Sequence, residues 1–434
     1  MHMISLTTTI ICTTASMGLA QNICDSDLTP AEARLARNRQ DAGAYSMRAG
    51  PVQPVVISVA WHVLETTDGR RAIEDDELQL MIDYLNDQWE TVNISFAAHP
   101  LVDRIVNDVW WDDVPDANEL RSMRRLPNAL NIYWAPSLEG GGLCGRSSFT
   151  FSTLDTIVMQ SSCLGYTDVR GVFAHEVGHW FDLFHTFETA TGVECVARTN
   201  CLNTGDLLCD TPASFGLQFT TCVDPITCNR KPGSFCNRSG PCPGDPLYDP
   251  STTNFMSYSV PPCISEFTPG QYERMRSTTD NLRSDYANTG LHDPCPADID
   301  GSLAVGANDV LALLDAYGPC SDDCESDITG DGQTDVNDVL VLLGAWGPCF
   351  SCTDANACDD GDPGTLDYCL FGTCTHEVIT GCAVGEIPDC NGHCVPAAWV
   401  GDGVCDDGSF THDGLPVFLN CDAFNCDGGD CICP

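Results

Sequence analysis

Apolar positions follow two different spacings along the first two thirds of the chain. β-Branched and apolar residues fill the segment 55–64, which predicts a strand, while apolar residues at helical spacing over 75–90 predict an amphipathic helix. Short apolar runs at 130–134 and 156–160 predict two more strands, and 267–285 predicts a helix that starts at a Thr-Pro pair. This mixture of strands and helices predicts an α+β domain.

The segment from His175 to His185 carries the most specific chemistry of the sequence. His175 and His179 are four residues apart, so they lie on the same face of a helix. His185 can join them only if the chain turns sharply after about Phe181. Asp182 occupies this turn, where a left-handed backbone favours glycine and a short polar residue is the next best tolerated. The spacing therefore predicts that His175, His179 and His185 bind Zn²⁺ and leave a fourth position open.

Glu176 directly follows the first histidine, which is where zinc peptidases place their general base. We expect a zinc-bound water to be the nucleophile, with Glu176 taking its proton and passing it to the leaving amine. Thr167 or Asp168 is expected to cap the start of this helix. One alternative is a zinc peptidase whose third ligand is a distant glutamate and not His185.

Composition points to the compartment in which the protein works. The 434 residues suffice for two to four domains, and the 28 cysteines favour an oxidising, extracellular setting. Residues 1–20 have the apolar character and small terminal residues of a secretory signal peptide, and no later segment is apolar enough to span a membrane. A net charge of −43, with Lys231 as the only lysine, argues against nucleic acid as a partner. The sequence thus predicts a secreted protein.

Residues 21–52 are polar and weakly patterned, and we interpret them as a propeptide. Removing the signal peptide also removes Cys12 and leaves an odd number of cysteines, so at least one thiol is free or paired between chains. Cys24 stands alone in this segment. Either it occupies the open zinc position and keeps a zymogen latent, or it forms an ordinary disulfide with the catalytic domain. Residues 190–253 are expected to form a large loop region held by disulfides.

Further motifs follow the histidine segment in a fixed order. They are Thr186-Phe187, Gly205-Asp206, Cys209-Asp210-Thr211-Pro212, Asn254-Phe255-Met256-Ser257-Tyr258-Ser259, and Cys263, Phe267-Thr268, Gln271 and Arg274-Met275. In this order and spacing they resemble the pappalysin branch of the metzincin zinc peptidases, which includes the archaeal ulilysin type. The resemblance covers roughly residues 53–290.

This resemblance implies a metzincin-like domain with a mixed sheet, an active-site helix and an irregular lower subdomain, separated by the active-site cleft. Met256 would pack beneath the zinc ion in a Met-turn. Tyr258 would stand near the metal and stabilise the oxyanion, unless it is an ordinary core tyrosine. Asp206 and Asp210 would either order their loop or bind calcium.

An internal repeat with an offset of 29 residues lies within 296–349. Each copy has an acidic loop with EF-hand spacing, a Leu-rich helix and a Gly-Pro-Cys end, and the pair resembles a dockerin. Leu303 replaces the turn glycine of the first copy, which weakens that copy. The predicted Ca²⁺ ligands are Asp327, Thr329, Asp331, Asp335 and Asp338 in the second copy and Asp298, Asp300, Ser302 and Asp309 in the first. A cohesin-like or cell-surface protein would be the partner; the alternative is a stabilising module without a partner.

Two cysteine-rich segments complete the chain. Residues 350–382 are expected to form a small disulfide-held module. Residues 383–434, with cysteines in the surroundings of Gly401-Asp402-Gly403 and Asp427-Gly428-Gly429-Asp430, resemble a Lin-12/Notch repeat that folds around calcium and disulfides.

The sequence therefore favours a secreted, zinc-dependent endopeptidase that hydrolyses peptide bonds in extracellular proteins or peptides. A second hypothesis is an inert, calcium-dependent adhesion or scaffold protein built on the same domains. Asp182 and Ser257, which depart from the family pattern, favour this second hypothesis, whereas the complete set of three histidines and Glu176 opposes it.

Overall fold

The computed structural model describes twelve stretches of the chain, and all structural statements refer to them. They are residues 22–24, 26–48, 50–165, 170–217, 221–233, 235–320, 324–353, 355–360, 365–378, 386–412, 415–421 and 424–431. The expected signal peptide at 1–20, the expected helix cap at Thr167 or Asp168, and the end of the expected module at 382 lie outside these ranges.

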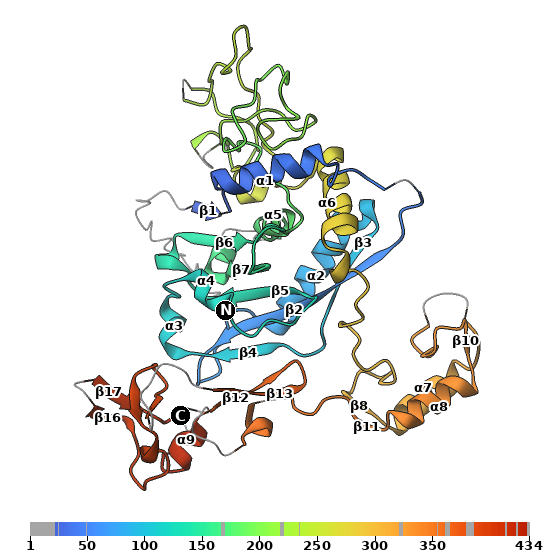
Figure 1. Ribbon diagram of the computed structural model, residues 1–434, viewed down its shortest axis with the longest axis vertical. Helices are drawn as coiled ribbons and strands as arrows, with labels where there is room; N and C mark the ends of the chain where they lie inside the picture. Colours follow the sequence, from blue (N-terminus) through green and yellow to red (C-terminus); the bar gives the residue numbers. More distant parts are fainter. Residues whose placement is uncertain are drawn as a thin grey trace, which may run out of the picture.

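A seven-stranded sheet forms the centre of the region that contains the histidine segment (Figure 1). Its order is β1-β6-β7-β5-β2-β3, and β4 pairs with the second half of β2. The paired strands run parallel except for β6, which is antiparallel to β7. The strands are β1 (Asn22–Cys24), β2 (Val55–Glu65), β3 (Ile94–Ala98), β4 (Asp103–Val106), β5 (Leu130–Ala135), β6 (Leu143–Ser147) and β7 (Thr156–Gln160). The predicted strands at 55–64, 130–134 and 156–160 correspond to β2, β5 and β7.

Helices and sheet enclose one large apolar core. The helices of this region are α1 (Pro30–Asp41), α2 (Asp75–Trp89), α3 (Asp108–Asp112), α4 (Ala117–Leu120), α5 (Arg170–Trp180) and α6 (Pro269–Leu282). Trp61 of β2 and Trp134 of β5 both pack on Phe173 of α5. Trp89, at the end of α2, contacts Phe181 just beyond α5. The mixed sheet with its packed helices confirms the predicted α+β class.

A hairpin from the C-terminal part of the chain covers part of the sheet face that lies opposite α5. It consists of β12 (Thr365–Leu370) and β13 (Thr373–Val378). Phe371 at its tip packs edge-on against His62 of β2 and His99, and forms a small cluster with Ala60 and Ala129. Successive residues of a strand point to opposite faces, so His62 lies on the face away from Trp61 and α5. The segment predicted as a separate module thus packs on the catalytic sheet.

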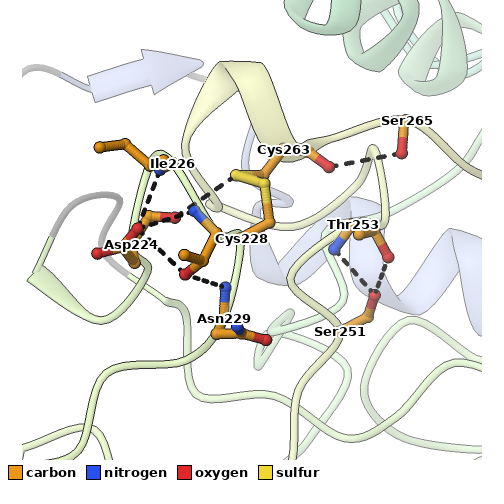
Figure 2. Close-up of a disulfide and its surroundings, with 9 residues drawn as sticks. Asp224, Ile226, Cys228, Asn229, Ser251, Thr253, Cys263 and Ser265 are labelled. Atoms are coloured by element: carbon orange, nitrogen blue, oxygen red, sulfur yellow. Dashed lines mark hydrogen bonds between the residues drawn. A yellow bond between two sulfur atoms is a disulfide. The ribbon is translucent and has the colours of Figure 1, made fainter.

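The irregular region between α5 and α6 is held by disulfides, as the sequence predicts. The bonds are Cys195–Cys242, Cys201–Cys209, Cys222–Cys236 and Cys228–Cys263. Figure 2 shows how the last of these ties the loop to a 3-10 turn (Pro261–Cys263). Asp224 organises the loop end, because its carboxylate accepts the backbone N–H groups of Ile226 and Thr227.

The repeat segment, residues 296–349, contains two helices, α7 (Ala307–Asp315) and α8 (Val336–Gly344), which pack together through Leu313 and Leu342. Short ladders join β8 (Ala304–Val305) to β11 (Gly347–Pro348) and β9 (Gly318–Pro319) to β10 (Gln333–Thr334). The Cys295–Cys349 disulfide joins the two ends of this segment.

The final segment folds around a small apolar cluster that includes Ile387, Val395 and Leu419. Its elements are β14 (Glu386–Pro388), β15 (Cys394–Pro396), β16 (Asp407–His412), β17 (Leu415–Phe418) and α9 (Asn425–Gly428). Disulfides Cys390–Cys421 and Cys405–Cys431 hold these elements. No helix in the described ranges has the length and apolar character required to cross a bilayer.

Candidate active site

Three imidazole rings converge at the end of α5. The Nε2 atom of His179 lies 3.0 Å from that of His175 and 3.1 Å from that of His185, and the remaining pair is 3.3 Å apart. All three side chains are buried. A tetrahedral ion with bonds of about 2.0–2.1 Å holds its ligand atoms roughly 3.3 Å apart, so the nitrogen atoms have a spacing that suits zinc. The structure therefore brings together the three predicted ligands.

The backbone reverses where the sequence requires it. Helix α5 ends at Trp180, and Asp182 has a φ of 61°, the left-handed conformation expected at the glycine position. The Leu183 N–H then donates to the Gly178 carbonyl, which closes the turn. Gly178 has a second role, because a Cβ atom there would lie 2.8 Å from Met256 Sδ. Glycine thus lets the Met-turn residue pack directly against the helix.

Each histidine is oriented by a contact at its other ring nitrogen. His175 Nδ1 donates to the Phe255 carbonyl at 2.6 Å, and His179 Nδ1 donates to the Leu183 carbonyl at 2.7 Å. His185 Nδ1 pairs with Asp27 Oδ1 at 3.0 Å. A proton on each Nδ1 leaves the Nε2 lone pair free for a metal ion.

Burial favours the neutral form of two of the imidazoles. It lowers the pKa of His175 to about 3, with His185 as the second cause. Burial likewise lowers the pKa of His179 well below its ordinary value, and the two neighbouring histidines add to this effect. Neutral imidazole is the form that binds metal, so the chemistry of this donor set matches a zinc site.

Glu176 lies beside this cluster and is fully buried, and its carboxylate lies against the side chains of Cys24 and Ser26. Burial raises its pKa to about 8. The space for its side chain comes from Gly145 of β6, where a Cβ atom would lie 2.7 Å from Glu176 Cγ. Sequence reasoning missed Gly145, whose role depends on a strand that the pattern did not predict.

Cys24 also reaches the histidine cluster. Its Sγ and the ring nitrogens of the three histidines lie within 4.8 Å of one another, and its thiol is buried and free. The expected alternative of a disulfide with the catalytic domain is therefore wrong. Strand β1 places the residue, because Cys24 pairs with Gly145 in a parallel ladder on β6. Burial, and next the charge of Glu176, raise the pKa of the thiol.

Tyr258 lies over the same site. Its ring centroid is 4.9 Å from that of His185, and its hydroxyl donates to the Cys24 carbonyl at 2.6 Å. The hydroxyl thus contacts a peptide carbonyl next to the ring nitrogens. Phe187, which stacks on His185, was not assigned a site role by the sequence reasoning.

Asp206 and Asp210, which belong to two neighbouring motifs of the sequence, behave differently. Asp210 Oδ2 accepts the Gly270 N–H at 2.6 Å, which orders the start of α6. Asp206 Oδ1 accepts the Leu208 N–H, but its other oxygen and both oxygens of Glu194 are buried without a hydrogen bond among the described residues. Burial, and next the charge of Asp206, raise the pKa of Glu194 to about 8.

The predicted calcium ligands lie in two loops far from the histidines in the sequence. In the first loop, carboxylate oxygens of Asp298, Asp300 and Asp309 lie within 4.8 Å of one another. In the second loop, Asp338 accepts the N–H groups of Thr329 and Asp335. The other predicted ligands, Ser302, Asp327 and Asp331, line the same two loops.

Comparisons with known proteins relate this chain to metallopeptidases. A family model described as Peptidase_M43, pregnancy-associated plasma protein-A, matches residues 145–280. An extracellular metalloprotease of Verticillium alfalfae is 32% identical over 249 residues, which cover 54% of this chain and 80% of that protein. An extracellular metalloprotease of Colletotrichum graminicola is 29% identical over 293 residues, covering 63% of this chain and 95% of the relative.

Among solved structures, Tannerella forsythia mature mirolysin in complex with a cleaved peptide aligns with a TM-score of 0.41 at 20% sequence identity, over 56% of this chain and 98% of mirolysin. The relatives define the class of this protein as metallopeptidases. The chain belongs to the family of extracellular metalloproteases, and its match to the Peptidase_M43 model falls within the same region.

Proposed function

We propose that the chain is a zinc endopeptidase that hydrolyses peptide bonds in extracellular proteins or peptides. The observation that carries this proposal is the convergence of three buried imidazole nitrogens beside the buried carboxylate of Glu176. His175, His179 and His185 would hold the ion. When bound there, zinc supplies Lewis acidity that favours attack of water on a carbonyl.

Glu176 would act as the general base. Its carboxylate takes a proton from the attacking water, holds it on one oxygen, and delivers it to the nitrogen of the leaving amine. Tyr258 would donate a hydrogen bond to the reacting carbonyl oxygen, as its hydroxyl does to the Cys24 carbonyl.

The test compares purified wild-type chain with the Glu176→Gln variant on a mixture of proteome-derived peptides, with and without a chelator. We expect chelator-sensitive cleavage by the wild type, and a loss of several powers of ten in rate for the variant with zinc content unchanged. Retained proteolysis by Glu176→Gln would refute the assignment of the base.

We infer that residues 21–52 keep the enzyme latent through Cys24. The free thiol beside the three histidines supports this, because thiolate is a good zinc ligand. Uncut Cys24→Ala chain should be at least ten times more active than uncut wild type. Equal activity of the two would remove the latency role and leave the peptidase assignment untouched.

Calcium binding is proposed for the two dockerin-like loops, and the acidic final segment resembles a calcium-binding repeat as well. Burial raises the pKa of Asp406 to about 6, with the charge of Asp427 as the second cause, which indicates a concentration of negative charge. The buried pair Glu194 and Asp206 offers unpartnered oxygens of the kind that Ca²⁺ prefers.

One observation favours a second function, in docking. Helices α7 and α8, with the residues just after them, expose apolar side chains at equivalent positions of the two repeats: Leu311 and Leu340, Leu314 and Leu343, Tyr317 and Trp346. Exposed apolar side chains that gather on one surface are typical of binding sites. We propose that this surface binds a protein partner, either a cohesin-like protein or a protein on a cell surface. We also propose that the chain acts outside the cell, as the names of its relatives indicate. Pull-down with wild-type chain and with Leu311→Asp/Leu340→Asp tests this.

A further inference from the structure

The N-terminal segment contacts the turn between His179 and His185 at a second point, remote in sequence from Cys24. At this point the segment binds the carboxylate of Asp182, which is fully buried. Thr150 donates to it twice, from its N–H at 2.8 Å and from its hydroxyl at 2.5 Å. The N-terminal segment supplies two more donors, Arg39 Nη1 at 3.2 Å and the Tyr45 hydroxyl at 3.0 Å.

Asp182 needs these partners because a buried carboxylate without them is costly. Arg39 is the cation that contacts it, and the guanidinium also bonds to the Thr150 hydroxyl and lies 5.2 Å from the centre of the Phe151 ring. Tyr45 is largely buried against the guanidinium of Arg274. Glycine, the usual residue of the turn, would offer none of these contacts.

Helix α1 of the N-terminal segment also packs on the peptidase domain around this contact. Ala33 and Ala36 of α1 are fully buried in a cluster with Phe149 and Phe184 of the peptidase domain. Arg37 donates to the Thr191 carbonyl at 2.8 Å. The linker that follows is different, because the described residues of 46–54 are exposed and belong to no helix or strand. A processing protease therefore reaches the linker more easily than α1.

We propose that Asp182, Thr150 and Phe151 form a receptor site for Arg39 and Tyr45, which keeps the N-terminal segment bound after the linker is cut. This rests on the latency proposed above for Cys24. Cleavage alone then leaves a non-covalent, inactive complex, and release of the segment is the step that opens the active site.

The experiment uses the full chain with a recognition site for a sequence-specific protease in place of residues 51–54. After complete cutting, gel filtration and mass spectrometry follow whether the segment stays with the enzyme over a series of dilutions. The variants are Arg39→Ala and Tyr45→Phe, and exposed Arg34→Ala is the matched control. All substitutions lie in the segment, so the released enzyme is the same in every case.

We expect the cut wild-type and Arg34→Ala segments to co-elute with the enzyme at micromolar concentration. Arg39→Ala should raise the concentration of half-dissociation at least tenfold, and Tyr45→Phe, which removes one hydroxyl and keeps the fold, should raise it severalfold. Equal midpoints for all variants, or a wild-type segment that separates at every concentration, would overturn the proposal. Because co-elution is measured and not activity, the result does not depend on whether Cys24 is the latency ligand.

Discussion

Gly145 and Glu176 are so close that a Cβ atom on Gly145 would lie 2.7 Å from Glu176 Cγ and 2.8 Å from its Oε1. Strand β6 thus leaves room for the carboxylate only because it has glycine at this point. The same strand pairs with β1, so the glycine lies where the backbone of the N-terminal segment crosses the site. A peptide substrate on this edge would meet Glu176 at the same place.

Gly145→Ala should displace Glu176 from its position and lower kcat/KM by about 10- to 100-fold, because a shift near 1 Å of a reacting group has effects of this size. Zinc content should not change, since the three atoms nearest to the added Cβ all belong to Glu176 and none to a histidine. Gly142→Ala is the matched control, because a Cβ atom there makes only ordinary contact, 3.6 Å from the Glu139 carbonyl. Full activity of Gly145→Ala would show that Glu176 tolerates the displacement.

Phe371→Ala should destabilise the catalytic sheet from its far side. The ring is buried against His62 and His99, and loss of a buried phenylalanine costs about 3 kcal/mol. We expect a lower midpoint for thermal unfolding of the catalytic domain, with little change in kcat at low temperature. Phe410→Ala, at an exposed position of β16, should leave the midpoint unchanged. If Phe371→Ala has no effect, the hairpin is not part of the folding unit.

The acidic pair Glu194 and Asp206 predicts how stability depends on pH in calcium-free buffer. Burial is the main cause that raises the two pKa values on folding, from 4.5 to about 8 and from 3.8 to about 6. A group with a raised pKa binds its proton more tightly in the folded state. The protonated group therefore contributes its full stability below its ordinary pKa. This contribution is lost as the pH rises through the pKa of the group in the folded state.

The thermal midpoint should thus fall between pH 4.5 and 8 in the wild type, and fall less steeply in Glu194→Gln, which cannot ionise. The exposed Glu273→Gln variant is the control. Added calcium should remove much of the decline in the wild type, because the cation pairs with the ionised oxygens. A decline of the same slope in Glu194→Gln would assign the pH dependence to other groups.

The residues that the sequence predicted well are those governed by local spacing. The turn at Asp182 and the meeting of His175 with His185 follow from helix geometry and the left-handed turn alone. Strand β6 was missed because Leu143–Ser147 has no regular apolar alternation and gains its place from pairing with β7 and β1. Helix α1 was missed because its buried face consists of two alanines, Ala33 and Ala36, which carry little hydrophobic signal.

The hairpin tip at Phe371 could not be predicted for a related reason. Its contacts with β2 join residues about 300 positions apart in the chain, and no local pattern specifies such a pair.

Leu303 shows the opposite case, in which the structure is more regular than the sequence suggested. It takes the glycine position of the first calcium loop, which weakened that prediction, yet it adopts a φ of 65° there. The loop therefore keeps the expected bend in spite of the substitution.

The two dockerin-like loops should each bind one calcium ion. Asp309 and Asp338 hold equivalent positions at the ends of their loops, and each is buried and accepts two backbone N–H groups of its own loop. Asp309→Asn and Asp338→Asn should each remove one tightly bound calcium per chain, relative to the wild type, in equilibrium dialysis. Asp315→Asn, at the exposed end of α7, should bind as much calcium as the wild type. Because the left-handed bend at Leu303 preserves the first loop, we expect Asp309→Asn to have an effect as large as Asp338→Asn. A loss of calcium confined to Asp338→Asn would mean that the bend alone does not make the first loop a binding site.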